Sequence, residues 1–290
     1  MPDFTITILE TPEQMTQVEA LQRIVWPGSE TDVIPAHMLL ASGHNGALVI
    51  GAYAGEELVG VVFGFPALDF VPDGPVLKHH SHILAVLPEW RSRGVGFALK
   101  RAQWQMARKQ GINRITWTYD PLMSRNANLN IANLGAVCST YIRSYYGEMR
   151  DGLNVGLASD RFQVDWWLNT PRVEWRLGKR ARGNFGLKHF QQAGIYPLYE
   201  ASLSPAGLLL PPKACPPLEK RLLLAEIPDD FLALKAGDMQ IALDWRMFTR
   251  EFFETAFSNG YLVTDFIYEP GADRPRSFYV LTHGESTLDE

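Results

Sequence analysis

Residues 87–96, with the sequence LPEWRSRGVG, contain two arginines and two glycines at a spacing that suits the binding of an anion: Arg91, Arg93, Gly94 and Gly96. An apolar run of strand length, residues 82–87, precedes them, and a run rich in helix-forming residues, 97–110, follows. The first backbone N–H groups of a helix have no partner within it, and with the helix dipole they attract anions. Glycines let a phosphate approach the backbone, and arginines add charge-assisted hydrogen bonds. The segment therefore predicts a phosphate-binding loop, and the alternative is an ordinary turn between a strand and a helix.

Two common phosphate motifs do not fit this segment. A dinucleotide-binding fingerprint needs a third glycine where this chain has Leu99. A P-loop needs Gly-Lys-Ser or Gly-Lys-Thr, and neither tripeptide occurs in the chain.

A third pattern fits better. The spacing Val86-x-Pro88-x-x-Arg91-x-x-Gly94-x-Gly96 resembles the acyl-coenzyme A motif of the GNAT superfamily of N-acyltransferases. In that family the loop amides hold the coenzyme A pyrophosphate, and the preceding strand splays from its neighbour and offers its backbone to the pantetheine arm. The resemblance is specific over residues 78–135 and extends from the N-terminus to about residue 168.

The resemblance implies which residues contact the coenzyme. It assigns the oxyanion of the reacting thioester to the amide of Leu84, and the pantetheine to the amide of Val86. The resemblance implies that the loop and the start of the helix bind the coenzyme phosphates, through Arg91, Arg93, Gly94, Val95, Gly96 and Phe97.

Acyl transfer to an amine also needs a base. The histone-acetylating branch of the family has a Glu where this chain has His80, and a neutral imidazole can accept an amine proton near neutral pH. By strand periodicity His80, His82, Leu84 and Val86 share one face unless a bulge intervenes. Two carboxylates are weaker base candidates: Asp69 and Asp120. The alternative is that the strand histidines are surface or hydrogen-bonded residues: His79, His80 and His82.

Acyl transfer also needs an acid that protonates the departing thiolate. The family commonly has a Tyr on the helix after the next strand, and aligning on Gly135 places Ile131 there. Tyr119 is the candidate substitute acid, and the alternative is that Tyr119 is a packing aromatic. In that case the thiolate leaves without a protein acid, through water. On the same helix, Ser124 stands where the family has Asn, and Asn126 is interpreted as a second coenzyme or substrate contact.

The flanking periodicity predicts the elements that must position these residues. Strands are expected at 4–9, 47–53, 58–65, 82–87, 112–119, 137–146 and 161–168, helices at 12–26, 35–42, 97–110 and 124–134, and a loop at 69–75. Their order matches the GNAT fold, an α/β (α+β) fold with a mixed, mostly antiparallel sheet and a splayed parallel strand pair. Later strands are expected at 222–227, 261–268 and 277–281, with a helix at 243–258.

The domain prediction follows from this pattern. Residues 1–168 are interpreted as the GNAT acyl-CoA-binding domain, and 169–290 as a C-terminal α/β extension, with a degenerate GNAT-like half as one interpretation. Basic residues gather at the start of the extension, either as a solvated linker or as a lid whose arginines meet the coenzyme phosphates or an acidic acyl group: Arg172, Arg176, Lys179, Arg180, Arg182 and Lys188.

Composition narrows the function classes. A formal net charge of -5 argues against a general nucleic-acid binder, and two cysteines argue against a disulfide framework or a Cys-based zinc site. With neither a signal-peptide pattern nor a membrane-length apolar run, a cytoplasmic protein is expected.

The leading prediction is an N-acyltransferase using acetyl-CoA or another acyl-CoA, without a metal, on a small-molecule amine or amino acid. A non-catalytic acyl-CoA-binding module is the alternative, neither nucleic acid nor membrane is an expected partner, and the oligomeric state is open, with a homodimer as one option.

Overall fold

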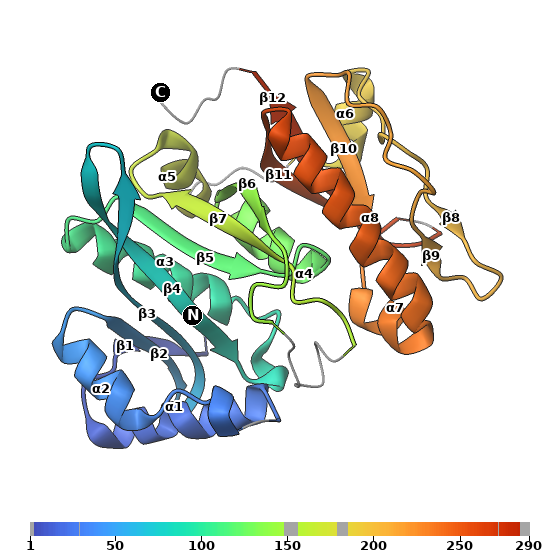
Figure 1. Ribbon diagram of the computed structural model, residues 1–290. Coiled ribbons are helices and arrows are strands. Elements are labelled where there is room, and N and C mark those ends of the chain that lie inside the picture. Colours follow the sequence, from blue (N-terminus) through green and yellow to red (C-terminus); the bar gives the residue numbers. More distant parts are fainter. Residues whose placement is uncertain (1–2, 29, 148–155, 179–184, 272, 285–290) are drawn as a thin grey trace. The chain divides into compact units, whose positions relative to one another are not determined.

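The computed structural model describes residues 3–28, 30–147, 156–178, 185–271 and 273–284 (Figure 1). Clustering of the backbone separates two compact units. The first contains the described residues up to Trp117 and the short segment Trp167–Asn169, and the second contains the rest. The division of the chain into two domains at residue 168 stays a prediction.

The first unit is built on a sheet with the strand order β1-β2-β3-β4-β5. Its strands are β1 (Thr5–Ile8), β2 (Leu48–Ala54), β3 (Glu57–Val71), β4 (Gly74–Val86) and β5 (Arg114–Tyr119). Neighbouring strands are antiparallel except β4 and β5, which are parallel. The expected fold class, a mostly antiparallel α/β sheet with one parallel pair, is confirmed.

Helices cover this sheet: α1 (Pro12–Val25), α2 (Ala36–His44) and α3 (Val95–Lys109), with short 3₁₀ turns at Glu30–Asp32 and Pro88–Trp90. The predicted start of α1 is confirmed, because Thr11 and Gln14 form a reciprocal capping box before a first-turn proline. On the sheet, α3 packs closely at Gly60, where a Cβ atom would lie 2.9 Å from Cγ1 of Val95. Leu99, on the same helix, is fully buried.

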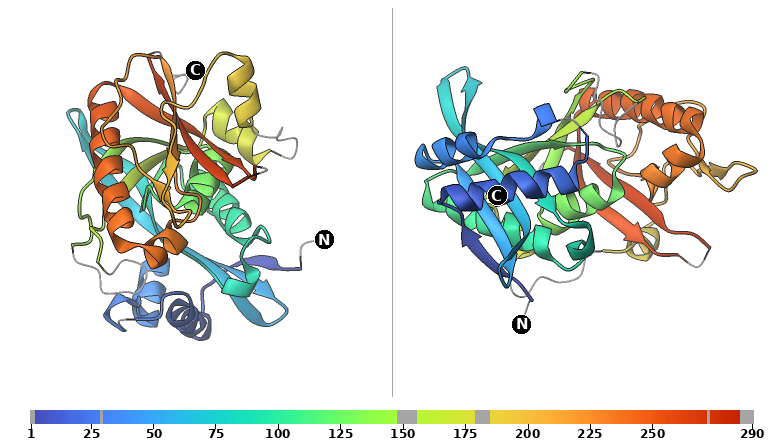
Figure 2. Two further views of the ribbon diagram at one scale, coloured as in Figure 1. Left: turned by 90° about the vertical axis from the view of Figure 1, so that its right-hand side faces the viewer. Right: turned by 90° about the horizontal axis from the view of Figure 1, so that it is seen from below.

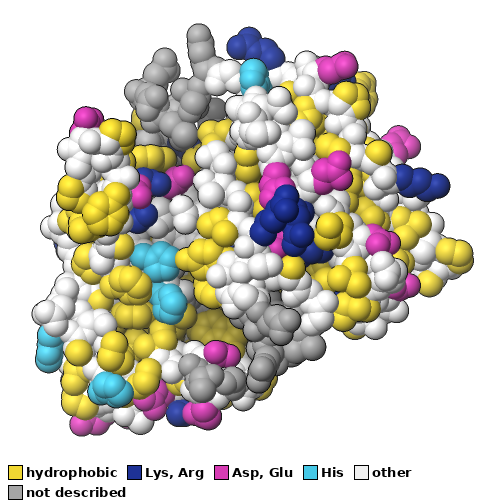
Figure 3. Space-filling view, in the orientation of Figure 1, with side chains coloured by type: hydrophobic (Ala, Val, Ile, Leu, Met, Phe, Trp, Pro, Cys, Tyr) yellow, Lys and Arg dark blue, Asp and Glu magenta, His cyan; other side chains and the backbone are white. Residues whose placement is uncertain are grey.

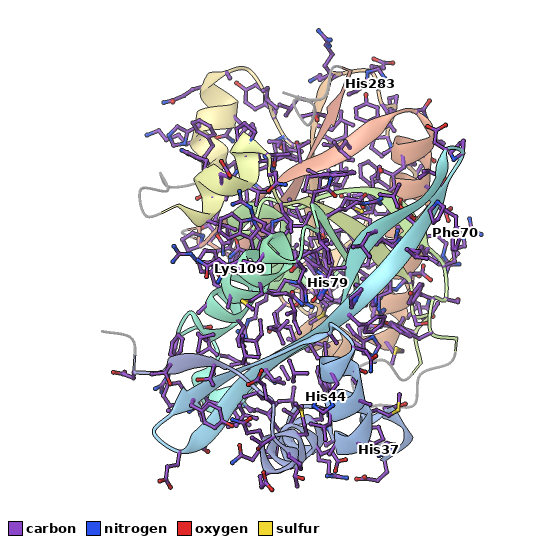
Figure 4. All side chains as sticks on the ribbon, turned by 90° about the vertical axis from the view of Figure 1, so that its left-hand side faces the viewer. His37, His44, Phe70, His79, Lys109 and His283 are labelled. Atoms are coloured by element: carbon purple, nitrogen blue, oxygen red, sulfur yellow. The ribbon has the colours of Figure 1, made fainter. Side chains whose placement is uncertain are left out.

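The hairpin of β3 and β4 is longer than predicted. The expected loop at 69–75 is wrong, because β3 continues to Val71 and β4 begins at Gly74. Pro75 is tolerated near the start of β4, as proline commonly is at the beginning of a strand. The end of the hairpin carries Phe70, which is 82% exposed (Figure 4).

The second unit contains an antiparallel sheet with the order β7-β6-β11-β12-β10. Its strands are β6 (Val137–Ile142), β7 (Arg161–Trp167), β10 (Leu222–Ile227), β11 (Tyr261–Glu269) and β12 (Arg276–His283). β6 ends before the predicted residue 146, because Ser144 adopts a positive φ of 45° and turns the chain. A small separate pair is formed by β8 (Ser202–Leu203) and β9 (Leu209–Leu210).

The helices of the second unit are α4 (Ser124–Ala127), which continues as a π-helical turn at Asn128–Asn133, α5 (Pro171–Leu177), α6 (Leu187–Gln192), α7 (Phe231–Gly237) and α8 (Met239–Ser258). The long helix α8 lies along this sheet (Figure 2). An aromatic core joins β7 to α8 and β12, with the Phe162 ring 4.6 Å from that of Phe253 and 5.4 Å from that of Tyr279.

Two of the basic residues after 168 form hydrogen bonds or ion pairs within the second unit. Arg172 donates to the backbone carbonyls of Gly135 and Thr264, and Arg176 forms an ion pair with Asp265 at 2.7 Å. Lys179, Arg180 and Arg182 lie outside the described residues. In the described part of the chain, no helix combines the length and the apolar character needed to cross a membrane.

Candidate functional site

The start of α3 has the geometry of an anion site. Gly94 is the N-cap and adopts a left-handed conformation with φ of 83°, which favours glycine. A Cβ atom built at this position has nothing within 4 Å, so the space beside the cap is open. The backbone N–H groups of Val95, Gly96 and Phe97 are the first in the helix, where no carbonyl of the preceding turn is available.

The two loop arginines are exposed and anchored locally. Nε of Arg91 donates to the carbonyl of Val86 at 3.3 Å, which ties the loop to the end of β4. The Arg93 guanidinium lies 5.0 Å from the centre of the Trp90 ring. Both keep further N–H groups that can bond a phosphate.

The strand before the loop has an open edge. The amide of Leu87 donates to Val59 of β3 at 3.0 Å, so strand alternation turns the amides of Leu84 and Val86 away from β3. On that side β4 pairs with β5 only at two positions among the described residues: His79 with Ile115 and His80 with Thr116. The backbone of β4 beyond them is therefore available to a ligand.

A β-bulge changes the predicted faces of this strand. Ile83 pairs with Phe63 and Ser81 with Gly64, which leaves His82 as the extra residue. The expectation that both histidines share a face with Leu84 and Val86 is corrected by this bulge.

Cross-strand partners show which face each residue occupies. Val86 pairs with Gly60, which faces Val95 of α3, so Val86 and Leu84 lie on the α3 side of the sheet. The ring centres of His80 and His82 are 5.9 Å apart and lie 5.3 and 5.9 Å from that of Phe65. Since Phe65 points away from α3 by strand alternation, the two histidines occupy the opposite face.

The two histidines are poised to be neutral. Burial, together with the positive charges of His82 and Lys78, lowers the pKa of His80 to about 4. Burial also lowers the pKa of His82. Figure 3 shows histidine side chains beside hydrophobic ones on the surface over β3 and β4. Uncharged imidazoles in such a setting can accept a proton from an incoming amine.

The other base candidates are carboxylates bonded to cations. Asp69 bonds Lys78 at 3.1 Å and also bonds Arg114, and the hydrogen bond from Lys78 lowers the pKa of Asp69. Asp120 forms a double hydrogen bond with the Arg246 guanidinium. The lowered pKa makes Asp69 a weaker base.

The remaining predicted site residues belong to the second unit. The Tyr119 hydroxyl is buried 3.1 Å from that of Tyr279, and burial raises the pKa of Tyr119 well above its ordinary value. Ser124 is buried, with Oγ 2.7 Å from Oγ of Ser277, whereas Asn126 is exposed. The loop, the strand amides and the histidines therefore belong to the first unit, and Tyr119, Ser124 and Asn126 belong to the second.

A buried polar cluster beside the strand was missed from the sequence: His79, Ser81, Lys100 and Gln103. One signal could have found part of it. Lys100 and Gln103 fall in the helical stripe that also contains Leu99 and Ala107, where an apolar side chain is expected. No group of three or more His, Cys, Asp or Glu side chains that could hold a metal occurs among the described residues.

Comparison with known proteins identifies the N-terminal segment. Residues 13–129 match the model of the Acetyltransferase (GNAT) family. The matched segment includes the loop, α3 and β4, so the resemblance predicted from the motif is confirmed. The search of curated proteins gave no match.

The solved structures that resemble this chain are distant from it. They include NAA60 from Arabidopsis thaliana with acetyl-CoA, at 14% identity and a TM-score of 0.46, covering 57% of this chain and 99% of that one. An aminoglycoside 6'-acetyltransferase type Ii matches at 16% identity and a TM-score of 0.44, covering 57% and 97%. A GNAT-family acetyltransferase from Desulfovibrio desulfuricans matches at 12% and 0.43, covering 57% and 99%. Similarities this distant transfer no substrate to this chain.

Proposed function

We propose that this protein is an N-acyltransferase that moves an acyl group from acyl-CoA to the amine of a small molecule or amino acid. One observation carries the proposal: the open N-terminus of α3 at Gly94 directly follows a strand whose amides at Leu84 and Val86 face an unpaired edge. Phosphates suit the first feature and an extended amide-containing arm suits the second.

The coenzyme would bind by its two ends. Its pyrophosphate accepts hydrogen bonds from the first amides of α3 and from Arg91 or Arg93. Its pantetheine arm bonds the amide of Val86, and the thioester carbonyl accepts from the amide of Leu84. As the amine attacks, the carbonyl oxygen gains negative charge, and a fixed N–H donor at that point stabilises the transition state.

The amine loses its proton to a histidine on the face of β4 opposite the side chains of Leu84 and Val86. We propose His80 or His82 as this base, directly or through one water, because both rings lie on the strand that carries the amide of Leu84 and both are neutral at pH 7. The lowered pKa keeps each ring unprotonated and also makes it a weaker base than an ordinary imidazole. The nitrogen forms a bond to the carbonyl carbon, and the C–S bond then breaks to release coenzyme A thiolate.

The thiolate must then gain a proton, from Tyr119 or from water. The buried bond of Tyr119 to Tyr279 and its raised pKa favour water. Ser124 and Asn126 remain proposed coenzyme contacts; Asn126 is the exposed member of the pair.

One observation keeps a second function open. Ile131, at the position of the usual family Tyr, is fully buried and has no proton to give. A non-catalytic acyl-CoA-binding module is the function that this departure favours.

Binding and chemistry separate the two proposals. A thermal-shift screen over acyl-CoAs comes first, and a ligand at 100 times its dissociation constant should add about 2.7 kcal/mol of stability. The best acyl-CoA is then mixed with a panel of small amines and amino acids, and free thiol and acylated product are measured by absorbance and mass spectrometry. Product formation supports the enzyme, binding without product supports the module, and absence of binding contradicts both.

A further inference from the structure

A buried polar cluster joins β4 to α3 behind the candidate site. Its four members are between 0 and 5% exposed: His79, Ser81, Lys100 and Gln103. The Gln103 side chain is its centre. Its Oε1 accepts from Nζ of Lys100 at 2.8 Å and from Oγ of Ser81 at 3.0 Å, and its Nε2 lies 3.2 Å from Nε2 of His79. One helix amide thus bonds two positions of the strand.

The chemistry of Lys100 sets the orientation of that amide. Nζ of Lys100 is 2.9 Å from Oγ of Ser81 and 2.8 Å from Oε1 of Gln103, and it lies 3.7 Å from the centre of the Trp117 ring. These are electron-rich partners for the N–H donors of Lys100, and burial lowers the pKa of this side chain well below its ordinary value. The carbonyl end of Gln103 must therefore face Lys100, and its NH₂ end faces His79.

This orientation of Gln103 fixes the tautomer of His79. Because Gln103 donates to its Nε2, the imidazole proton resides on Nδ1. Burial, with the nearby charge of Lys100, lowers the pKa of His79 to about 3, so the ring is neutral. In Figure 4, His79 lies in the interior on the α3 side of the sheet. In this arrangement the polar groups of Ser81, Lys100 and Gln103 have matched donors and acceptors, whereas the buried Nδ1 of His79 has no hydrogen-bond partner among the described residues.

The cluster and the β-bulge occupy the same place in the strand. Gly64 pairs with Ser81 at the register shift, and a Cβ at Gly64 would overlap Nε2 of His79 and lie 2.8 Å from Nε2 of Gln103. The bulge is the point at which the histidines and the side chains of Leu84 and Val86 take opposite faces of β4, while the amides of those two residues point to its open edge. Fixing the strand here fixes both groups at once.

We propose that Gln103 is a positioning residue that locks β4 to α3 at the bulge, and so sets the amide of Leu84 at the thioester carbonyl relative to the phosphate site at the start of α3. This inference rests on the proposed function. Gln103 lies two helical turns beyond the N-terminal amides, so it leaves the phosphate contacts intact. Its loss should therefore disturb the carbonyl end of the coenzyme and spare the phosphate end.

The test compares two substitutions on one helix. Gln103→Leu removes both ends of the amide with little change of size, and Gln105→Leu makes the same change on the exposed face. The probe is acetyl-CoA labelled with ¹³C at the thioester carbonyl. Calorimetry gives its affinity and infrared difference spectroscopy gives the stretching frequency of the bound carbonyl, and neither readout needs an acceptor amine.

We expect all three proteins to bind acetyl-CoA with similar affinity, within about threefold, because the phosphate site is unchanged. The carbonyl frequency should fall on binding to the wild type and to Gln105→Leu, and stay near its free value in Gln103→Leu. With an acceptor amine, kcat of Gln103→Leu should drop by about 10–100-fold at constant KM for acetyl-CoA, the effect of a small misplacement of reacting groups.

Other results overturn the proposal. An equal carbonyl shift and an equal kcat in Gln103→Leu would mean that the cluster only supports the fold, while the proposed function stands. Failure of the wild type to bind acetyl-CoA would remove the proposed function and this inference together. If Gln103→Leu does not fold, Ser81→Ala deletes one hydroxyl from the strand side. It should lower kcat about 3–10-fold, the value of one hydrogen bond, and an unchanged kcat refutes the positioning role.

Discussion

Gly64 lies directly against the imidazole of His79, so closely that a methyl group at position 64 would overlap Nε2 of that ring. The same methyl group would lie 2.6 Å from the backbone carbonyl of His80, which cannot move without distorting β4. A glycine in the interior of a strand is usually a liability, and here it makes room for the buried cluster.

We therefore expect Gly64→Ala to destabilise the protein by roughly 1–3 kcal/mol, as overpacking of a filled interior does. Urea unfolding followed by circular dichroism measures this change. Gly43→Ala is the matched control, because Gly43 lies inside α2 with nothing within 4 Å of the added Cβ. That substitution should be neutral or stabilise by about 0.5–1 kcal/mol. Equal behaviour of the two variants would contradict the packing described for Gly64.

The buried histidines predict how stability depends on pH. The pKa of His79 is lowered to about 3 and that of His80 to about 4, below the value of about 6.5 expected in the unfolded chain. Between these limits the unfolded chain binds more protons than the folded one, so stability is full above pH 6.5 and is lost as the pH falls toward 4. The slope from one such group is at most about 1.4 kcal/mol per pH unit.

Urea unfolding at pH 7, 6 and 5 measures that slope. His79→Asn removes one titrating group, so its stability should change less steeply over this range than that of the wild type. Parallel curves for the two proteins would show that His79 does not titrate as its burial requires.

The segment before residue 168 depends on the segment after it. In the second unit, Phe162 packs against Phe253, and Tyr119 bonds Tyr279, so removal of residues 169–290 would expose these buried groups. A protein ending at Leu168 should therefore be insoluble or inactive, through loss of buried apolar surface. Soluble expression with full coenzyme binding and activity would refute this dependence and would support residues 1–168 as an independent domain.

Local signals in the sequence predicted much of this structure. The Arg-x-x-Gly-x-Gly spacing predicted the loop before α3, which begins at Val95 and not at the predicted residue 97. The helix predicted at 12–26 begins at Pro12. Periodicity could not reveal the bulge at His82, because that bulge depends on what lies opposite, at Gly64 and Gln103. Proline and glycine at 72–75 suggested a long loop, whereas cross-strand pairing extended both strands almost to the turn. Long-range contacts decide both features, and no short window contains them.

The histidines provide a test of the proposed chemistry. His80→Ala or His82→Ala should lower kcat/KM at pH 7 by about 10²–10⁴-fold, the usual value of general-base catalysis. The loss should shrink as the pH rises, since the amine then arrives without its proton. Affinity for coenzyme A should stay nearly constant, because both rings lie on the face of β4 opposite Leu84 and Val86. Near wild-type rates in both variants at every pH would mean that the two histidines are structural.

We propose that coenzyme A binds at the start of α3, and calorimetric titration of coenzyme A into two glutamate variants tests this binding site. Gly94 and Gly111 stand just outside opposite ends of α3, both have positive φ, and both have open space around an added Cβ. Gly94→Glu and Gly111→Glu therefore impose similar backbone strain and the same added charge, but only the first enters the phosphate path. We predict that Gly94→Glu abolishes measurable binding while Gly111→Glu keeps the wild-type affinity. Retained affinity in Gly94→Glu, or equal losses in both variants, would contradict the assignment of the coenzyme site.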